Sequence, residues 1–122
     1  MKVNKNENIT CYDVDETLVL WFNKCDPSKK VKIVCPYGGS ETWLKPHHRH
    51  IDLLKKHAGR KNYVIVWSAA GVLWAEAVVK ALGLEEYVDL VMTKPSKIVD
   101  DMIPNDIFPC RIFLTDKDEV DE

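Results

Sequence analysis

Apolar residues gather in short runs along the chain, and turn-forming or polar residues separate one run from the next. Segment 8–13 (NITCYD) is β-prone and predicts a strand that ends near Asp13. Segment 62–68 (NYVIVWS) is almost continuously apolar, which is typical of a strand buried on both faces. Further short strands are expected at 88–94 (VDLVMTK), 97–101 (KIVDD) and 110–116 (CRIFLTD).

Two segments instead repeat their apolar residues at helical spacing. Segment 46–59 begins with Pro46 and closes with Gly59, both typical of helix ends. Its apolar face consists of Ile51, Leu54 and Ala58. Segment 71–83 predicts a second helix, with Gly83 just beyond its end. The apolar stripe of this helix consists of Leu73, Ala77, Val78 and Ala81.

The segment between the first strand and the first helix has a different pattern. Residues 18–45 contain two β-rich runs, VKIVC and SETWLK, around the turn-forming residues PYGG. Two such runs around a Pro/Gly turn predict a β-hairpin or flap. Elsewhere helices alternate with buried strands, which indicates an α/β fold with a mainly parallel sheet covered on both sides, a Rossmann-like three-layer sandwich. A chain of 122 residues suits one such domain, 1–122.

The charge balance weakly constrains the partners. The formal net charge of -2 argues against a general polyanion-binding protein. Residues 45–61 nevertheless hold six Lys or Arg against one Asp, a stretch able to draw anionic substrates toward a site. Among phosphorylated substrates, this stretch favours a nucleotide or nucleic-acid end, but it does not distinguish these from a sugar phosphate or a phosphoprotein.

Membrane insertion and secretion are not expected. No window approaches the run of about 18 apolar residues that a membrane span needs, and the polar start MKVNKNENIT lacks the apolar core of a secretory signal. The cysteines form no CxxC pair. We expect a cytoplasmic protein without structural disulfides, although a Cys25–Cys35 bridge across the hairpin is an alternative.

The strand ends carry the candidate chemistry. In a parallel sheet, ligands bind beyond the carboxyl ends of the strands. The first strand is followed by two acids, Asp13 and Asp15, and the second ends in a hydroxyl, Ser68. The third is followed by a basic residue, Lys94, and the fourth by two more acids, Asp100 and Asp101. Chance places one polar group at a strand end easily, but rarely a complementary set at four.

Phosphoryl transfer needs such a set. One carboxylate can attack phosphorus and form an aspartyl-phosphate that water later hydrolyses. A second acid two residues further on can protonate the leaving oxygen and then activate water. Ser68 and Lys94 would hold phosphoryl oxygens. Asp13, Asp100 and Asp101 are candidate ligands for Mg²⁺, which prefers hard oxygen donors.

The same motifs resemble those of the haloacid dehalogenase (HAD) superfamily. DVDETL resembles the first motif, VIVWS the second, and TKPSKIVDD a compressed form of the third and fourth. The motifs stand in family order and span residues 9–101. The usual helix between the last two motifs is missing, since only five residues separate Lys94 from Asp100. A flap at 18–45 replaces the cap domain, which implies an open site and large substrates.

The resemblance implies a role for each residue. Asp13 is the nucleophile and Asp15 the general acid/base, while Ser68 and Lys94 bind the phosphoryl group. Mg²⁺ is bound by the Asp13 carboxylate, the Asp15 backbone carbonyl and an acid of the last motif. That acid is Asp100, with Asp101 bound to the ion or next to it. In this family an Asp at the Asp15 position marks phosphatases, so phosphomonoester hydrolysis is the expected reaction.

Two other function classes fit parts of the pattern. A receiver-like signalling domain also has an acidic pair, a hydroxyl and a Lys at strand ends, but strand 62–68 lacks its phosphoacceptor Asp. A catalytically silent binding module on the same fold is the second. Individual residues also have simpler explanations: Asp13 and Asp15 as an acidic turn, and Ser68 as a helix cap. Capping, packing or a surface position is the expected role of the histidines, His47, His48, His50 and His57, with a substrate contact by His47 or His48 as the alternative. Packing is the expected role of the tryptophans, Trp21, Trp43, Trp67 and Trp74, and the alternative for Trp21 and Trp43 is to fix the flap or stack on a substrate.

Overall fold

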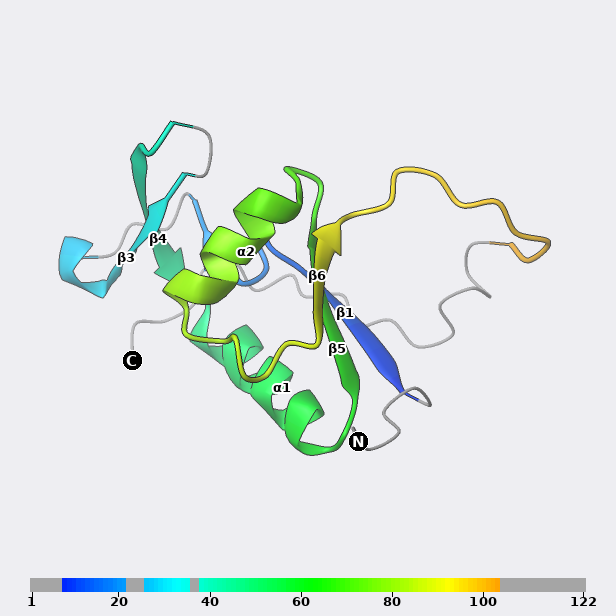
Figure 1. Ribbon diagram of the computed structural model, residues 1–122. Coiled ribbons are helices and arrows are strands. Elements are labelled where there is room, and N and C mark those ends of the chain that lie inside the picture. The colour runs from blue at the N-terminus through cyan, green and yellow to red at the C-terminus, as the bar shows by residue number, and fades with distance from the viewer. Residues whose placement is uncertain (1–7, 22–25, 36–37, 104–122) are drawn as a thin grey trace.

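The computed structural model describes residues 8–21, 26–35 and 38–103, and its ribbon is shown in Figure 1. A three-stranded parallel sheet has the order β1-β5-β6, where β1 is Ile9–Asp13, β5 is Tyr63–Ser68 and β6 is Leu90–Thr93. A separate antiparallel sheet has the order β2-β4-β3, from Val19–Leu20, Glu41–Pro46 and Val31–Val34. The helices are α1 (His48–Gly59), α2 (Val72–Ala81) and the short 3-10 helix η1 (Pro27–Lys29). The expected α/β class is confirmed.

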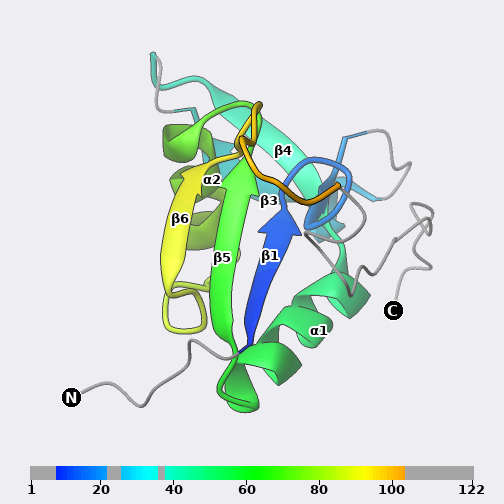
Figure 2. The ribbon, with the colours of Figure 1, turned by 90° about the vertical axis from the view of Figure 1, so that its right-hand side faces the viewer.

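The parallel sheet brings three chain segments to one edge. In its register Asp13 lies beside Trp67, and Ser68 lies beside Thr93. Figure 2 faces this sheet and shows the arrowheads of β1, β5 and β6 pointing the same way. The carboxyl ends of all three strands therefore meet at the same edge.

Both α-helices lie on the same side of the parallel sheet (Figure 1). The crossovers β1–α1–β5 and β5–α2–β6 step in the same direction, and right-handed crossovers then place both helices on one face. Burial along β5 agrees: Val64, Val66 and Ser68 are buried, whereas Tyr63, Ile65 and Trp67 are partly exposed. The prediction that this strand is buried on both faces is therefore wrong for the part of the chain that the structure describes.

The core joins the helices to both sheets. Leu54 of α1, Val78 of α2 and Val66 of β5 are fully buried. Ile33 and Leu44 of the antiparallel sheet belong to the same buried cluster, and α2 packs against β3 as well as against β5. The antiparallel sheet is therefore part of the body of the fold.

The flap expected at 18–45 is confirmed and extended. Strands β3 and β4 pair from Val31–Leu44 to Val34–Glu41, and β2 adds to the other edge of β4. Pro46 ends β4 instead of opening the helix, because α1 is capped by His47, whose Nδ1 accepts a hydrogen bond from the His50 amide at 3.4 Å. Helix α2 ends at Ala81, and Gly83, with a φ of +66°, lies just beyond its end as predicted.

The strand expected at 97–101 is absent: this segment has no regular structure, and Val99 is 96% exposed. In Figure 1 the chain after β6 leads away from both sheets. A strand is stabilised by packing on a neighbour, and Ile98 and Val99 have none in the described structure. The strand expected at 110–116 lies outside the described residues.

The expectations on thiols and membranes can be checked in part. Cys11 and Cys35 are free thiols, and Cys25, the other end of the alternative bridge, lies outside the described residues. Burial raises the pKa of the Cys11 thiol. None of the helices in the described segments is long and apolar enough to span a bilayer.

The surroundings of His57 predict that the stability depends on pH. His57 Nδ1 is hydrogen-bonded to the Tyr12 hydroxyl at 2.5 Å. Burial, reinforced by the charge of Arg60, lowers the pKa of His57. As the pH is lowered through the ordinary histidine pKa of about 6.5, the unfolded chain binds more protons than the folded one. The free energy of unfolding therefore decreases as the pH decreases. The free energy of unfolding of wild type should drop relative to that of His57→Gln between about pH 7.5 and about pH 5.5. If the two free energies of unfolding differed by the same amount across this range, His57 would not be the source of the pH dependence.

Candidate active site

The loop after β1 is a tight turn anchored in the core. The Val14 carbonyl accepts hydrogen bonds from the amides of Thr17, Leu18 and Val19 at 3.1, 2.8 and 3.3 Å. The Glu16 amide donates to the Val19 carbonyl at 2.8 Å, and Glu16 has a φ of +60°. Val14 and Leu18 are fully buried. The backbone that carries Asp13 and Asp15 is therefore held both by the hydrogen bonds of the turn and by the burial of Val14 and Leu18.

Asp13 and Asp15 flank Val14 and are the first pair of candidate residues. Side chains two residues apart on an extended chain point to the same side, so burying Val14 turns both carboxylates away from the core. Lys94 Nζ lies 3.9 Å from Asp13 Oδ1, and the two side chains are 43% and 38% exposed. The Ser68 hydroxyl donates to Asp15 Oδ2 at 3.4 Å. Each acid thus faces a partner from another strand.

Ser68 ties three elements together at the end of β5. Its carbonyl accepts hydrogen bonds from the amides of Gly71 at 3.1 Å and Lys94 at 2.9 Å. Its hydroxyl accepts from the Ala70 amide at 3.0 Å, and the residue is fully buried. The N-cap of α2 is Gly71, so Ser68 is not the cap that the sequence allowed.

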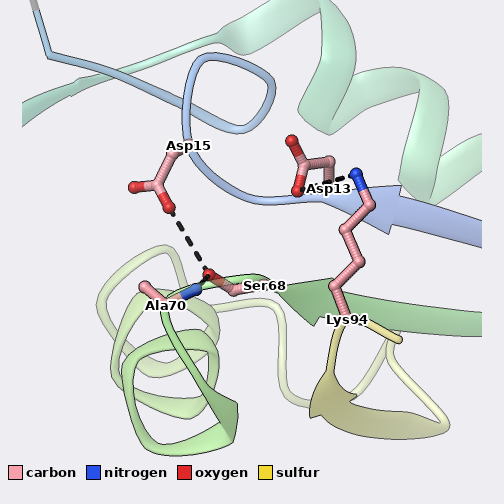
Figure 3. A network of polar contacts seen from close by, with 5 residues as sticks. All are labelled: Asp13, Asp15, Ser68, Ala70 and Lys94. Atoms are coloured by element: carbon pink, nitrogen blue, oxygen red, sulfur yellow. Dashed lines mark hydrogen bonds and ion pairs between the residues drawn. The ribbon is translucent and has the colours of Figure 1, made fainter. Parts of the chain in front are cut away.

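Figure 3 shows the resulting arrangement, with Lys94 reaching from β6 to Asp13 and Ser68 facing Asp15. The Lys94–Ser68 backbone hydrogen bond keeps the two pairs next to each other. Two carboxylates, a hydroxyl and an ammonium group, expected from three separate strand ends, do converge.

Asp100 and Asp101 are not part of this cluster. Both are exposed on the segment that leads away from the sheet. Asp100 Oδ1 accepts a hydrogen bond from the Met102 amide at 2.9 Å, which lowers the pKa of the Asp100 carboxyl. Among residues 8–21, 26–35 and 38–103, no group of three or more His, Cys, Asp or Glu side chains is arranged to bind a metal.

Two tryptophans complete the site, although packing was the expected role of both and a hydrogen bond to Asp15 was expected of neither. Trp21 Nε1 donates to Asp15 Oδ1 at 2.7 Å, and Trp74 Nε1 donates to the same oxygen at 3.1 Å. No sequence signal could have identified them, because Trp21 lies six residues after Asp15 and Trp74 lies in a different element. Only the fold brings the two indoles to one carboxylate.

The histidines support the loop from the side of α1. His50 Nδ1 donates to the Thr17 carbonyl at 2.6 Å, and the His47 amide donates to the Leu18 carbonyl at 2.9 Å. The rings of His47 and His50 stack with centroids 3.3 Å apart, and both residues are buried. The expected capping and packing roles are confirmed for this pair.

Comparison with models of known protein families, with curated proteins and with solved structures finds no match to this chain. The assignment of function therefore depends on the residues and their geometry.

Thr93 holds the start of α2 next to this site, which gives a stability prediction. Its Oγ1 accepts a hydrogen bond from the Val72 amide at 3.0 Å, while the N-cap Gly71 has no side chain to do so. Thr93→Val should lower the free energy of unfolding by about 1 kcal/mol, the usual loss for a helix cap. Thr93→Ser keeps the hydroxyl and is the control in the same denaturant titration. Equal stability of wild type and Thr93→Val would contradict the capping role.

Proposed function

We propose that this chain is a Mg²⁺-dependent phosphomonoester hydrolase of the HAD type that works through an aspartyl-phosphate. The observation that carries the proposal is the convergence of Asp13, Asp15, Ser68 and Lys94 at one edge of the parallel sheet. These four groups supply a nucleophile, an acid/base and two partners for phosphoryl oxygens. The order of the motifs along the sequence supports the same assignment.

In the proposed reaction, a carboxylate oxygen of Asp13 forms a bond to phosphorus while the bond from phosphorus to the ester oxygen breaks. The leaving oxygen takes a proton from the carboxyl group of Asp15, and the alcohol departs. Water then attacks the aspartyl-phosphate and gives its proton to the Asp15 carboxylate. Phosphate leaves, and both acids return to their starting states. The half-exposed Asp13 side chain is accessible to a substrate.

Lys94 and Ser68 bind the phosphoryl group in this proposal. At 3.9 Å the Lys94–Asp13 ion pair is long, and the Lys94 side chain is 43% exposed, so an incoming anion can share its ammonium group. The Ser68 hydroxyl accepts from the Ala70 amide and therefore has its own proton to donate, either to Asp15 or to a phosphoryl oxygen. Both groups offset charge that develops during transfer.

Mg²⁺ is the proposed cofactor, and the donors at the end of β1 suit it in kind. Asp13 Oδ1 already faces a cationic group, and carboxylate and carbonyl oxygens are the ligands that Mg²⁺ prefers. The ion would be held by the Asp13 carboxylate and the Asp15 backbone carbonyl. Asp100 and Asp101, the further ligands that the resemblance implies, lie outside this cluster and would have to approach it from the exposed segment after β6. When bound, it neutralises charge on the phosphoryl oxygens.

The complete fold that we propose is a single Rossmann-like domain with three layers and a flap in place of a cap domain. Its support is the partly exposed second face of β5, where Ile65 and Trp67 suit a further layer. A cytoplasmic protein is also proposed, since Cys11 and Cys35 are free thiols. The substrate class is a phosphate monoester, and nucleic-acid ends are among the candidates.

Replacing the nucleophile gives the most direct test of the reaction. Asp13→Asn should abolish release of phosphate from an aryl phosphate, because the amide oxygen is too weak a nucleophile to attack phosphorus. Asp52→Asn makes the same chemical change on an exposed side chain of α1 and should keep wild-type turnover. An Asp13→Asn protein that retains full activity would exclude the aspartyl-phosphate route.

Removal of the metal tests the cofactor separately. Turnover should be lost in excess chelator and should return when Mg²⁺ is added back. Ca²⁺ should restore it poorly, because it is larger and takes more ligands in a looser geometry. The same aryl phosphate assay measures all three conditions. Activity that is unchanged in chelator would contradict the assignment of Mg²⁺.

A further inference from the structure

Asp15 receives more hydrogen bonds than a solvated surface acid needs. Its Oδ1 accepts from Trp21 at 2.7 Å and from Trp74 at 3.1 Å, while among the described residues its Oδ2 accepts the longer bond of 3.4 Å from Ser68. The two oxygens of this carboxylate are therefore unequal. Oδ1 is saturated by two donors, and Oδ2 has the weaker partner.

The two indoles come from different elements and pack on each other. Trp21 directly follows β2, and Trp74 lies in the first turn of α2. Their ring centroids lie 5.9 Å apart, and the angle between the ring planes is 33°. The Trp21 backbone amide also donates to Glu16 Oε1 at 2.8 Å, which fixes Trp21 against the loop that carries Asp15. Each indole thus holds the other in place.

Packing alone explains one of these bonds but not the other. Trp74 is only 7% exposed, so its indole N–H needs a protein acceptor wherever it is buried. Trp21 is 43% exposed, and its N–H could be satisfied by water. Its short bond to Asp15 is therefore not required by burial, which indicates a role in holding the carboxylate.

We propose that Trp21 and Trp74 are positioning residues that hold Oδ1 of Asp15, so that Oδ2 exchanges the proton with the leaving oxygen and with water. The proposal rests on the proposed function, which assigns proton transfer to Asp15. An indole N–H is a donor only, so it can fix a carboxylate without competing for the transferred proton. A general acid must lie within hydrogen-bond reach of its target, and small displacements are costly.

The kinetic test removes one donor and keeps the ring. Trp21→Phe should lower kcat by about tenfold to a hundredfold, which is part of the roughly 10²–10⁴-fold that acid–base catalysis contributes, and leave KM nearly unchanged. Trp43→Phe is the matched control, because Trp43 is an exposed tryptophan, at 52%, on β4. A Trp21→Phe protein with the kcat and KM of Trp43→Phe would overturn the proposal.

A second measurement needs no turnover. The chain has four tryptophans, whose indole N–H resonances can be assigned with Trp→Phe variants of the full chain. Asp15→Ala should shift the resonances of Trp21 and Trp74 and leave that of Trp43 in place. Unmoved Trp21 and Trp74 signals overturn the proposal, whether or not wild type is active. Shifted signals in a wild-type protein without phosphatase activity would instead show that the proposed function fails, and the positioning role with it, although the indoles do bind Asp15.

Discussion

The parallel alignment of three short strands is the constraint on which the rest of the structure depends. Because β1, β5 and β6 run the same way, Asp13, Ser68 and Lys94 reach one edge from segments that are distant in sequence. An antiparallel β6 would carry Lys94 to the opposite edge, out of reach of Asp13. The Lys94 amide donates to the Ser68 carbonyl at 2.9 Å, which extends this alignment one residue beyond the sheet. The chemistry of the site is thus a consequence of strand direction.

A polar site of this kind needs apolar support. Neighbouring carboxylates repel, and the chain holds Asp13 and Asp15 together because Val14 between them is locked into the core. Partners from other segments then reduce the repulsion between the two carboxylates. An ammonium group lies beside Asp13, and a hydroxyl and two indole N–H groups donate to Asp15. The buried His50 secures the far side of the turn through the Thr17 carbonyl.

The sequence predicted those parts of the site that depend on local order. Asp13, Ser68 and Lys94 follow strands, and a parallel sheet is the natural result of alternating strands and helices. The failures have a tertiary origin. Ile98 and Val99 have strand-forming side chains but no neighbour to pair with among the described residues. The two indoles reach Asp15 because Trp74 of α2 packs against Trp21, which follows β2. Propensity cannot report contacts of that kind.

The antiparallel sheet is connected to the loop that carries Asp15. Strand β2 begins where the turn after Asp15 ends, pairs with β4, and leads directly into Trp21. Strand β4 in turn leads into α1, whose first turn holds the Thr17 carbonyl through His50. The flap is therefore connected to the acidic loop at two places, through Trp21 at Asp15 and through His50 at Thr17. Residues of β2, β4 and the loop also share one buried core, so the antiparallel sheet and the backbone that carries the Asp15 carboxylate support each other.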